Sequence, residues 1–203
     1  MASDTGMEAV SNELLGQRLR DLRVQSGKSL RAVARELGIS ASAVSQIERG
    51  MMRPSVSRLI GYVSAIDVPL AAVFDVPDTA SAEPEEPADA RAFAIRRSWE
   101  VSAIQLSGGV TFRRLSPVPT PDVEFFESTY PPQAVSTAHG QFLKHDGYEV
   151  GTVTAGELTI EFESEVVTLA KGDSITFPCS RPHIIGNRSE TVTAVATWLI
   201  VHH

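Results

Sequence analysis

The stretch that decides the fold of the first part of the chain is LRAVARELGISASAVSQIER, residues 30–49. Its apolar residues recur at helical spacing, at Leu30, Val33, Ala34 and Leu37 and then at Val44 and Ile47. Gly38 is a residue that ends helices, and Ser40 is a preferred N-cap residue for a second helix. The stretch therefore predicts two short helices joined by a tight turn of about three to four residues.

The predicted second helix has two unlike faces. On a wheel of about 100° per residue, Val44 and Ile47 point to one side. The opposite side collects the polar residues Ser42, Ser45, Gln46 and Arg49. This arrangement is typical of a helix-turn-helix, whose second helix enters the major groove of DNA. Gln46 is suited to adenine, Arg49 to guanine or a phosphate, and the two serines to either.

A motif at the end of this stretch resembles the Cro/cI-type repressors, also called the xenobiotic-response-element family. It consists of SQIERG at 45–50 followed by RPS at 53–55, and the resemblance covers about residues 14–74. The alternative reading is a small helical interaction or dimerisation module with a solvated polar stripe.

The resemblance also implies individual roles. Arg23 on the first helix would pair with Glu48 and lock the recognition helix. Ser40 would be the N-cap of that helix, with backbone amides of neighbouring helix N-termini facing phosphate. Arg31 and Arg53 would contact phosphates.

The rest of residues 14–74 continues the helical pattern. Further apolar stripes over 15–22 and 56–63, and a short segment after Pro69, bring the expectation to about five helices. Serines and glycines stand where helices should begin and end, at Gly27, Ser29, Gly50 and Ser55. Residues 10–60 hold nine Lys/Arg against four Asp/Glu, so this part is locally basic although the formal net charge is −7.

An acidic segment separates the two parts of the chain. Residues 75–90 contain six acidic residues, three prolines and no basic residue. This composition predicts a solvated, Pro-rich linker over 75–92. Residues 1–13 are expected to form a flexible N-terminus.

Beyond the linker the apolar period changes to two. The pattern predicts an all-β domain over 93–203, an antiparallel sandwich or barrel, and hence an α+β multidomain chain. The predicted strands are 94–97, 101–106, 110–115, 123–130, 148–154, 158–162, 166–169, 174–177 and 191–201.

Two blocks in this half resemble the paired motifs of the cupin family, a small double-sheet β-barrel. The first is HDGYE at 145–149 followed by Gly156. The second begins at Gly172 and continues with PCSRPH at 178–183 and then Asn187. The resemblance covers about residues 105–201.

These blocks contain candidate metal ligands. His145 and Glu149 are four residues apart and would share one face of an extended strand, with Gly147 between them leaving space. His183 would arrive from another strand. Two imidazoles and one carboxylate suit a divalent Fe, Zn, Mn or Ni ion. Leu143 stands where metal-binding cupins usually have a further histidine.

Other residues of the barrel keep a second interpretation open, a polar interior that holds an organic effector. Ser180 replaces the glycine that follows the motif proline, and His139 is an alternative ligand that the spacing does not require. Cys179 is expected to be an inert, packed thiol. Of Arg113 and Arg114, one should face inward and could hold an effector carboxylate.

Together these patterns predict a sequence-specific transcriptional regulator whose cupin domain binds a small-molecule effector, a metal ion or both, and which is not an enzyme. One short recognition helix reads few base pairs, so a homodimer on a palindromic operator in double-stranded DNA is expected. The rival interpretation is a mononuclear non-haem iron oxidase resembling hydroxypropylphosphonate epoxidase. No apolar run approaches the roughly 20 residues of a membrane span. The single cysteine and the absence of a signal-peptide pattern favour a cytoplasmic protein.

Overall fold

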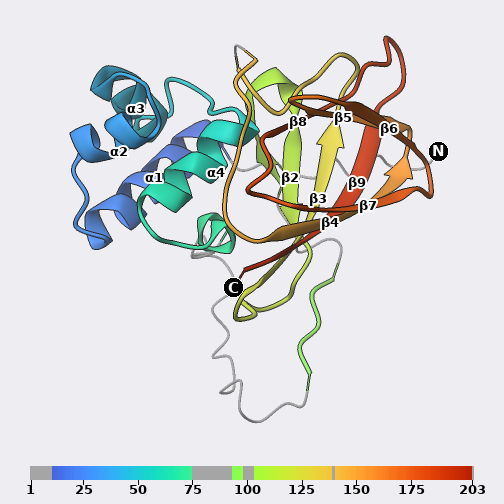
Figure 1. Ribbon diagram of the computed structural model, residues 1–203. Helices are drawn as coiled ribbons and strands as arrows, with labels where there is room; N and C mark the ends of the chain where they lie inside the picture. Colours follow the sequence, from blue (N-terminus) through green and yellow to red (C-terminus); the bar gives the residue numbers. More distant parts are fainter. Residues whose placement is uncertain (1–10, 75–92, 98–102, 139, 203) are drawn as a thin grey trace, which may run out of the picture.

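The computed structural model describes residues 11–74, 93–97, 103–138 and 140–202 (Figure 1). It has the expected α+β architecture, with the helices gathered on one side and the antiparallel strands on the other. The predicted linker 75–92, residues 1–10 of the predicted flexible N-terminus, and His139 lie outside the described residues.

Residues 11–74 form four α-helices and one short 3-10 helix. They are α1 (Asn12–Gln25), α2 (Leu30–Glu36), α3 (Ala41–Glu48), α4 (Val56–Ala65) and η1 (Leu70–Val73). The expected count of about five helices is therefore slightly off, because the segment after Pro69 is a four-residue 3-10 turn, too short for α-helical hydrogen bonding to establish itself. Among the described residues, no helix has both the length and the apolar character that crossing a membrane requires.

Serine hydroxyls cap all four α-helices, which confirms the N-caps predicted at Ser29, Ser40 and Ser55 and adds Ser11. The Ser40 Oγ, for example, accepts a hydrogen bond of 3.1 Å from the Ala43 amide. The turns after α1, α2 and α3 contain Gly27, Gly38 and Gly50, which have positive φ angles of 71°, 64° and 70°.

The apolar stripes predicted from the sequence form the core of the helical domain. Leu19, Val33, Val44 and Leu59 have no measurable exposure, and Ile47 is 2% exposed. The orientation of α3 is therefore set by apolar packing on its inner face, which leaves its polar face outward.

The strands form two sheets. They are β1 (Ile104–Gln105), β2 (Thr111–Arg114), β3 (Val123–Tyr130), β4 (Tyr148–Ala155), β5 (Glu157–Phe162), β6 (Val166–Ala170), β7 (Ser174–Pro178), β8 (His183–Gly186) and β9 (Ala194–Val201). Six of them pair in the order β1-β2-β3-β9-β4-β7, and the other three in the order β6-β5-β8. Residues facing the interior, such as Phe126, Ile160 and Trp198, fill the space between the sheets. Gly151 is required on β4, because a Cβ there would lie 2.3 Å from the Trp198 ring.

The strand predictions were wrong in three places. Residues 94–97 form no strand, and the strand expected over 101–106 is reduced, within the described residues, to Ile104–Gln105. The four-residue strand β8 is additional to the predicted set. It is short, and it follows a Pro-rich turn that interrupts the alternating pattern.

The helical domain packs directly on the barrel through α4 and η1 (Figure 1). The Ser57 amide at the start of α4 donates to the Ser136 carbonyl at 2.9 Å, and the Ala71 amide donates to the Glu124 carboxylate at 3.0 Å. One continuous apolar cluster contains buried residues of both domains. The two domains are therefore docked in this conformation.

Candidate functional site

The outer face of α3 carries the polar residues that the sequence places there. Ser42 and Arg49 are exposed, and Ser45 and Gln46 are partly buried. The Arg49 Nε donates to the Ser45 carbonyl at 3.2 Å, which lays the arginine along its own helix. The face is therefore narrow and able to approach a base edge closely.

Three other predicted DNA contacts lie around α3. Arg31 on α2 and Arg53 after α3 are both exposed. Ser40 is exposed, and its Oγ accepts the capping hydrogen bond, which leaves its hydroxyl proton available to donate to a phosphate. A helix N-terminus with nearby guanidinium groups favours phosphate.

A buried ion pair locks α3 against α1. The Arg23 Nε lies 2.6 Å from the Glu48 Oε1, and its Nη2 lies 2.9 Å from Oε2, so the pair is bidentate. The Tyr62 hydroxyl donates to the same Oε1 at 2.6 Å. Hydrogen bonding with Glu48 raises the pKa of Arg23, although burial opposes this shift. The pKa of Tyr62 is also raised, chiefly by burial and secondly by its hydrogen bond with Glu48. Tyr62 is a member of this network that sequence reasoning missed.

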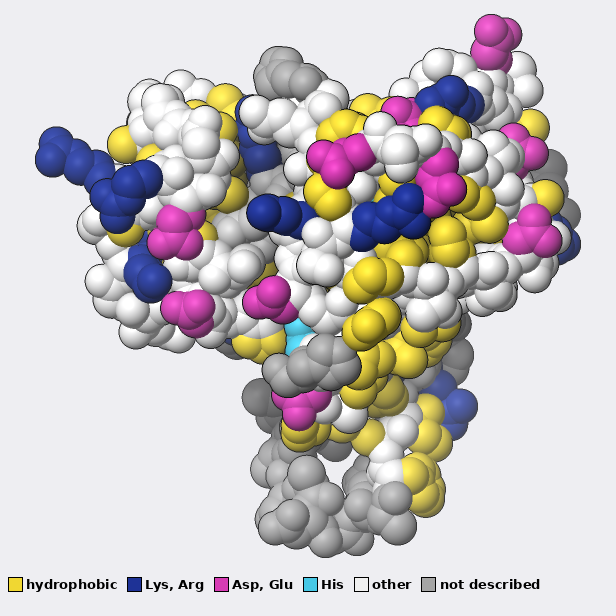
Figure 2. All heavy atoms as spheres, in the orientation of Figure 1, with side chains coloured by type: hydrophobic (Ala, Val, Ile, Leu, Met, Phe, Trp, Pro, Cys, Tyr) yellow, Lys and Arg dark blue, Asp and Glu magenta, His cyan; other side chains and the backbone are white. Residues whose placement is uncertain are grey.

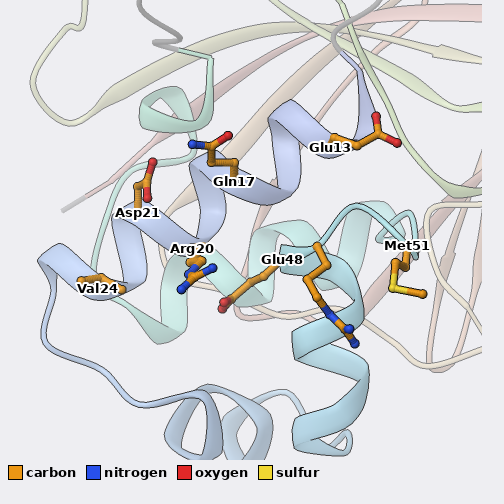
Figure 3. Close-up of a pocket in the computed structure, with 8 residues that line it drawn as sticks. Glu13, Gln17, Arg20, Asp21, Val24, Glu48 and Met51 are labelled. Atoms are coloured by element: carbon orange, nitrogen blue, oxygen red, sulfur yellow. The ribbon is translucent and has the colours of Figure 1, made fainter.

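A hollow of about 830 Å³ lies between α1 and the end of α3 (Figure 3). Glu13, Gln17 and Asp21 line it from α1, and Met51 lines it from the turn after α3. Arg20 and Arg49 also line it, so basic and acidic side chains are mixed there and the hollow is not a uniformly basic surface for the DNA backbone. The face of α3 that carries Ser42 and Gln46 is the better candidate.

Inside the barrel, Glu149 and His183 point to the interior from opposite sheets. Glu149 on β4 is 4% exposed, and His183 at the start of β8 is 1% exposed. The Glu149 Oε1 lies 3.0 Å from the His145 Nε2 and 3.8 Å from the His183 Nε2. Glu149 thus lies near both predicted histidines, but the residues whose ligand atoms all lie within 4.8 Å of one another are His145, Glu149 and Cys179, without His183.

His145 reaches this position differently from the prediction. β4 begins at Tyr148, so His145 and Glu149 do not share one extended strand. Gly147 turns the chain with a φ of 97°, and a Cβ at this position would lie 2.4 Å from the Val201 carbonyl oxygen. The turn folds the His145 ring back onto Glu149.

Backbone carbonyls orient both imidazoles. The Nδ1 atom lies 3.1 Å from the Asp146 carbonyl in His145 and 2.9 Å from the Arg181 carbonyl in His183. A carbonyl only accepts, so each Nδ1 carries a proton. The His145 Nε2 carries a proton as well, because it donates to the Glu149 carboxylate, whereas the His183 Nε2, 3.8 Å from Glu149, can present a lone pair. The Glu149 Oε2 is buried and has no hydrogen-bond partner among the described residues.

The pKa values of the two histidines are shifted in opposite directions. Burial lowers the pKa of both rings, but hydrogen bonding with Glu149 and its charge reverse this in His145, so that its pKa is raised. In His183 burial prevails and the pKa is lowered. A proton on the His145 Nε2 satisfies the Glu149 Oε1, and a cation bound by the carboxylate and the rings would take the place of that proton.

Cys179 and Leu143 complete the surroundings of this site. Leu143 lines the cavity with a hydrocarbon side chain. Cys179 has no exposed surface, and the ligand atoms of Cys179, His145 and Glu149 all lie within 4.8 Å of one another. Burial and then the charge of Glu149 raise the pKa of the thiol to about 12.

Arg114 is the inward member of the arginine pair. It is 1% exposed, and its Nε donates to the Ser116 Oγ at 3.1 Å. Arg113 forms an ion pair of 2.7 Å with Glu127. Neither arginine lines the cavity beside Glu149.

That cavity has a volume of about 20 Å³, enough for one water-sized molecule. Its lining includes Glu149 and His183 from the barrel and, unexpectedly, Val56 and Ile60 from α4. Val56 and Ile60 are functional candidates that sequence reasoning missed. Their spacing marked them as core residues without indicating what they pack against.

A second hollow of about 570 Å³ lies at the boundary between the domains. In Figure 2 a histidine side chain is visible at this junction. Ile60 and Ile200 line both hollows, and His145 and Glu124 line the outer one. The outer hollow therefore adjoins the inner cavity across two isoleucine side chains.

Comparisons with known proteins agree with this division. A helix-turn-helix family model (HTH_3) matches residues 19–73, and a cupin domain model (Cupin_2) matches residues 126–200. The chain is similar to the HTH-type transcriptional regulator PuuR of Escherichia coli (strain K12), with 29% identity over 180 residues that cover 89% of this chain and 91% of the relative.

Solved structures resemble the chain over almost its whole length. An HTH_3 family transcriptional regulator from Vibrio cholerae has a TM-score of 0.67 and 23% identity, covering 95% of this chain and 97% of that one. At this identity the likeness shows the fold. Hydroxypropylphosphonic acid epoxidase from S. wedmorenis has a TM-score of 0.43 and 16% identity, covering 95% and 100%, and a likeness at that level supports no functional argument.

Proposed function

Since the chain joins a helix-turn-helix domain of the HTH_3 type to a cupin domain, we propose that it is a sequence-specific DNA-binding regulator whose barrel senses a ligand. One observation carries this proposal. The polar face of α3 points outward on a helix that is capped by Ser40 and locked by Arg23 and Glu48. A relative that spans most of the chain is itself a transcriptional regulator.

On DNA, α3 would lie in the major groove. Gln46 would read a base edge, Ser42, Ser45 and Arg49 would contact bases or phosphates, and Arg31 and Arg53 would hold the backbone. Base contacts give specificity, whereas phosphate contacts give affinity for any sequence. The two kinds of contact can be separated by mutation.

The test uses duplexes selected by the protein from a random pool. Gln46→Ala should weaken binding to the selected sequence by about 1–3 kcal/mol and leave binding to random DNA nearly unchanged. Arg31→Ala should weaken both and lower the salt slope by about one. Gln17→Ala, on the α1 side of the hollow in Figure 3, is the matched control. Equal losses for Gln46→Ala and Gln17→Ala would refute the assignment of α3.

A homodimer is the proposed form on DNA, since two recognition helices about 34 Å apart read a palindrome. The outer face of the six-stranded sheet offers exposed apolar side chains at Phe125, Tyr148 and Val150. A second copy of the chain on this face would bury them. Sedimentation should give about twice the monomer mass, and Val150→Lys should return it to the monomer value.

The barrel residues fit a divalent cation. The unpartnered Glu149 Oε2, the His183 Nε2 and, once its proton is released, the His145 Nε2 are donors that a metal ion would satisfy. His145, Glu149 and His183 would hold Fe, Zn, Mn or Ni, and the ion would supply a coordination position for a small effector. These residues bind and orient; none is assigned a catalytic role.

We propose that the contact between α4 and the barrel couples ligand binding in the barrel to the DNA affinity of the helical domain. The Ser136 Oγ accepts from the Ile185 amide on β8, the strand that carries His183, and the Ser136 carbonyl accepts from the Ser57 amide on α4. A ligand that fits one arrangement of β8 and α4 better would shift the population of the DNA-competent form. Binding is then reciprocal: Co²⁺, used as a probe, should change DNA affinity by the same factor by which DNA changes Co²⁺ affinity.

We propose that the barrel is not an oxidase site. The cavity of about 20 Å³ beside Glu149 is too small for an organic substrate while α4 covers it, and the adjoining hollow of about 570 Å³ is lined by His145 but by neither Glu149 nor His183. Anaerobic loading with Fe²⁺ followed by exposure to oxygen tests this. Oxygen consumption above that of Glu149→Gln would favour the oxidase instead. A regulator of this kind would act in the cytoplasm, where its DNA is.

A further inference from the structure

The Cys179 thiol lies beside two of the proposed metal ligands, His145 and Glu149. We propose that Cys179 is itself a ligand and that, with His145 and Glu149, it forms a thiolate-containing site for a divalent transition metal. This inference rests on the proposed metal-binding role of the barrel. It replaces the interpretation of Cys179 as an inert thiol.

The distances are compatible with one shared ion. The ligand atoms of the three residues lie within 4.8 Å of one another, and the His145 Nε2 is already 3.0 Å from the Glu149 Oε1. With zinc–sulfur and zinc–nitrogen bonds of about 2.3 and 2.0–2.1 Å, two ligands of a tetrahedral ion are about 3.5 Å apart. Small side-chain adjustments therefore suffice.

The backbone holds Cys179 against the turn that carries His145. The Cys179 amide donates to the Gly147 carbonyl at 2.8 Å, and the His145 amide donates to the Cys179 carbonyl at 3.1 Å. These two bonds fix the Cα positions of both residues before any ion binds. Pre-positioned ligands are what a selective metal site needs.

The net charge of the ion and its ligands favours a site that includes the Cys179 thiolate over a site made only of the two histidines and Glu149. A dication held by His145, His183 and Glu149 leaves one uncompensated positive charge in a buried place. With Glu149 and a Cys179 thiolate the ligand charges balance the ion. Glu149 Oε2, buried and without a partner in the described part of the chain, supplies the second independent sign of a missing cation. His183 lies 3.8 Å from Glu149 but is not among the residues whose ligand atoms all lie within 4.8 Å of one another, so the proposed site has three protein ligands.

Binding involves a simple exchange. The S–H bond of Cys179 breaks, a sulfur–metal bond forms, and the proton passes to the buffer. A sulfur ligand selects Zn²⁺, Fe²⁺, Co²⁺ or Ni²⁺ over Mn²⁺ and Mg²⁺. The site would therefore discriminate among the ions that a histidine and carboxylate triad alone accepts.

The test is an anaerobic titration of untagged, metal-free protein with Co²⁺. We expect one equivalent to bind and to give thiolate-to-cobalt charge-transfer absorption in the near ultraviolet, and X-ray absorption of the zinc form to show a sulfur neighbour at about 2.3 Å. Cys179→Ser should abolish the charge-transfer band and weaken Co²⁺ binding by at least about tenfold. Ser128→Ala is the matched control, because Ser128 is buried in the same barrel but bonds to Trp198.

Each outcome has a distinct meaning. Stoichiometric Co²⁺ without the band, or with unchanged affinity in Cys179→Ser, overturns the thiolate ligand and leaves the site of His145, Glu149 and His183 in place. Failure to bind any equivalent of Co²⁺ overturns both forms of the metal site. DNA binding by the same preparation is measured separately, so the DNA-binding function stands or falls on its own result. The wild-type spectrum decides the question even if Cys179→Ser does not fold.

Discussion

At the scale of single residues, the Arg23–Glu48 pair is expected to be the polar interaction most costly to break. Glu48→Ala would leave the Arg23 guanidinium buried and remove the acceptor of Tyr62, so a loss of about 3–5 kcal/mol in unfolding free energy is expected. Glu165→Ala, which breaks the exposed Arg181–Glu165 pair, should cost about 0–1 kcal/mol. Urea unfolding measures both. Equal losses would show that the pair does not secure α3.

The role of a residue could be predicted from the sequence where that role depends on its near neighbours in the chain. Ser40 as a cap and Glu149 as an inward carboxylate both follow from neighbours a few positions away. The proximity of Cys179 to His145 does not, because it arises from backbone pairing between segments far apart in the chain. Nothing in the residues around Cys179 distinguishes a ligand from a packed thiol.

At the scale of elements, α3 depends on its cap. Ser40→Ala removes the acceptor of the Ala43 amide and should cost about 1 kcal/mol of stability. Ser42→Ala, two positions later on the exposed face, should change the unfolding free energy by less than about 0.5 kcal/mol. Chemical denaturation followed by circular dichroism compares them. A Ser42→Ala loss as large as that of Ser40→Ala would contradict the capping argument.

The elements themselves were predicted unevenly. The α-helices have period, cap and stop signals that agree with one another, so α1 to α4 follow from the sequence. β8 has only four residues and no alternation, since all four are buried. The predicted strand 148–154 begins where β4 begins, but the four-residue spacing of His145 and Glu149 was wrongly interpreted as one extended face. At the turn between them, the Val201 carbonyl lies too close to Gly147 for any side chain.

At the scale of the whole molecule, the two domains are expected to unfold together because α4 belongs to both cores. Ile60→Ala should remove packing between them and cost about 2–5 kcal/mol. The far-ultraviolet helical signal and tryptophan fluorescence, both tryptophans lying beyond the linker in sequence, should then change at different urea concentrations. Leu59→Ala, at a fully buried residue lining neither of the two hollows at the barrel, is the control.

Coincident transitions in Ile60→Ala would show that the packing of Ile60 is not what couples the domains. Such docking could not be predicted from the sequence. Helical periodicity reports that Val56 and Ile60 are buried, but burial inside the helical bundle and burial on the barrel give the same pattern.

The position of Ile60 between the outer hollow and the inner cavity has a kinetic consequence. Because Ile60 and Ile200 separate the two spaces, we expect a molecule larger than water to reach Glu149 only after α4 moves, so that entry waits for this opening step. The observed association rate should therefore rise with ligand concentration and then level off at the opening rate. A regulator closed in this way would respond to sustained changes in its ligand and filter out brief ones.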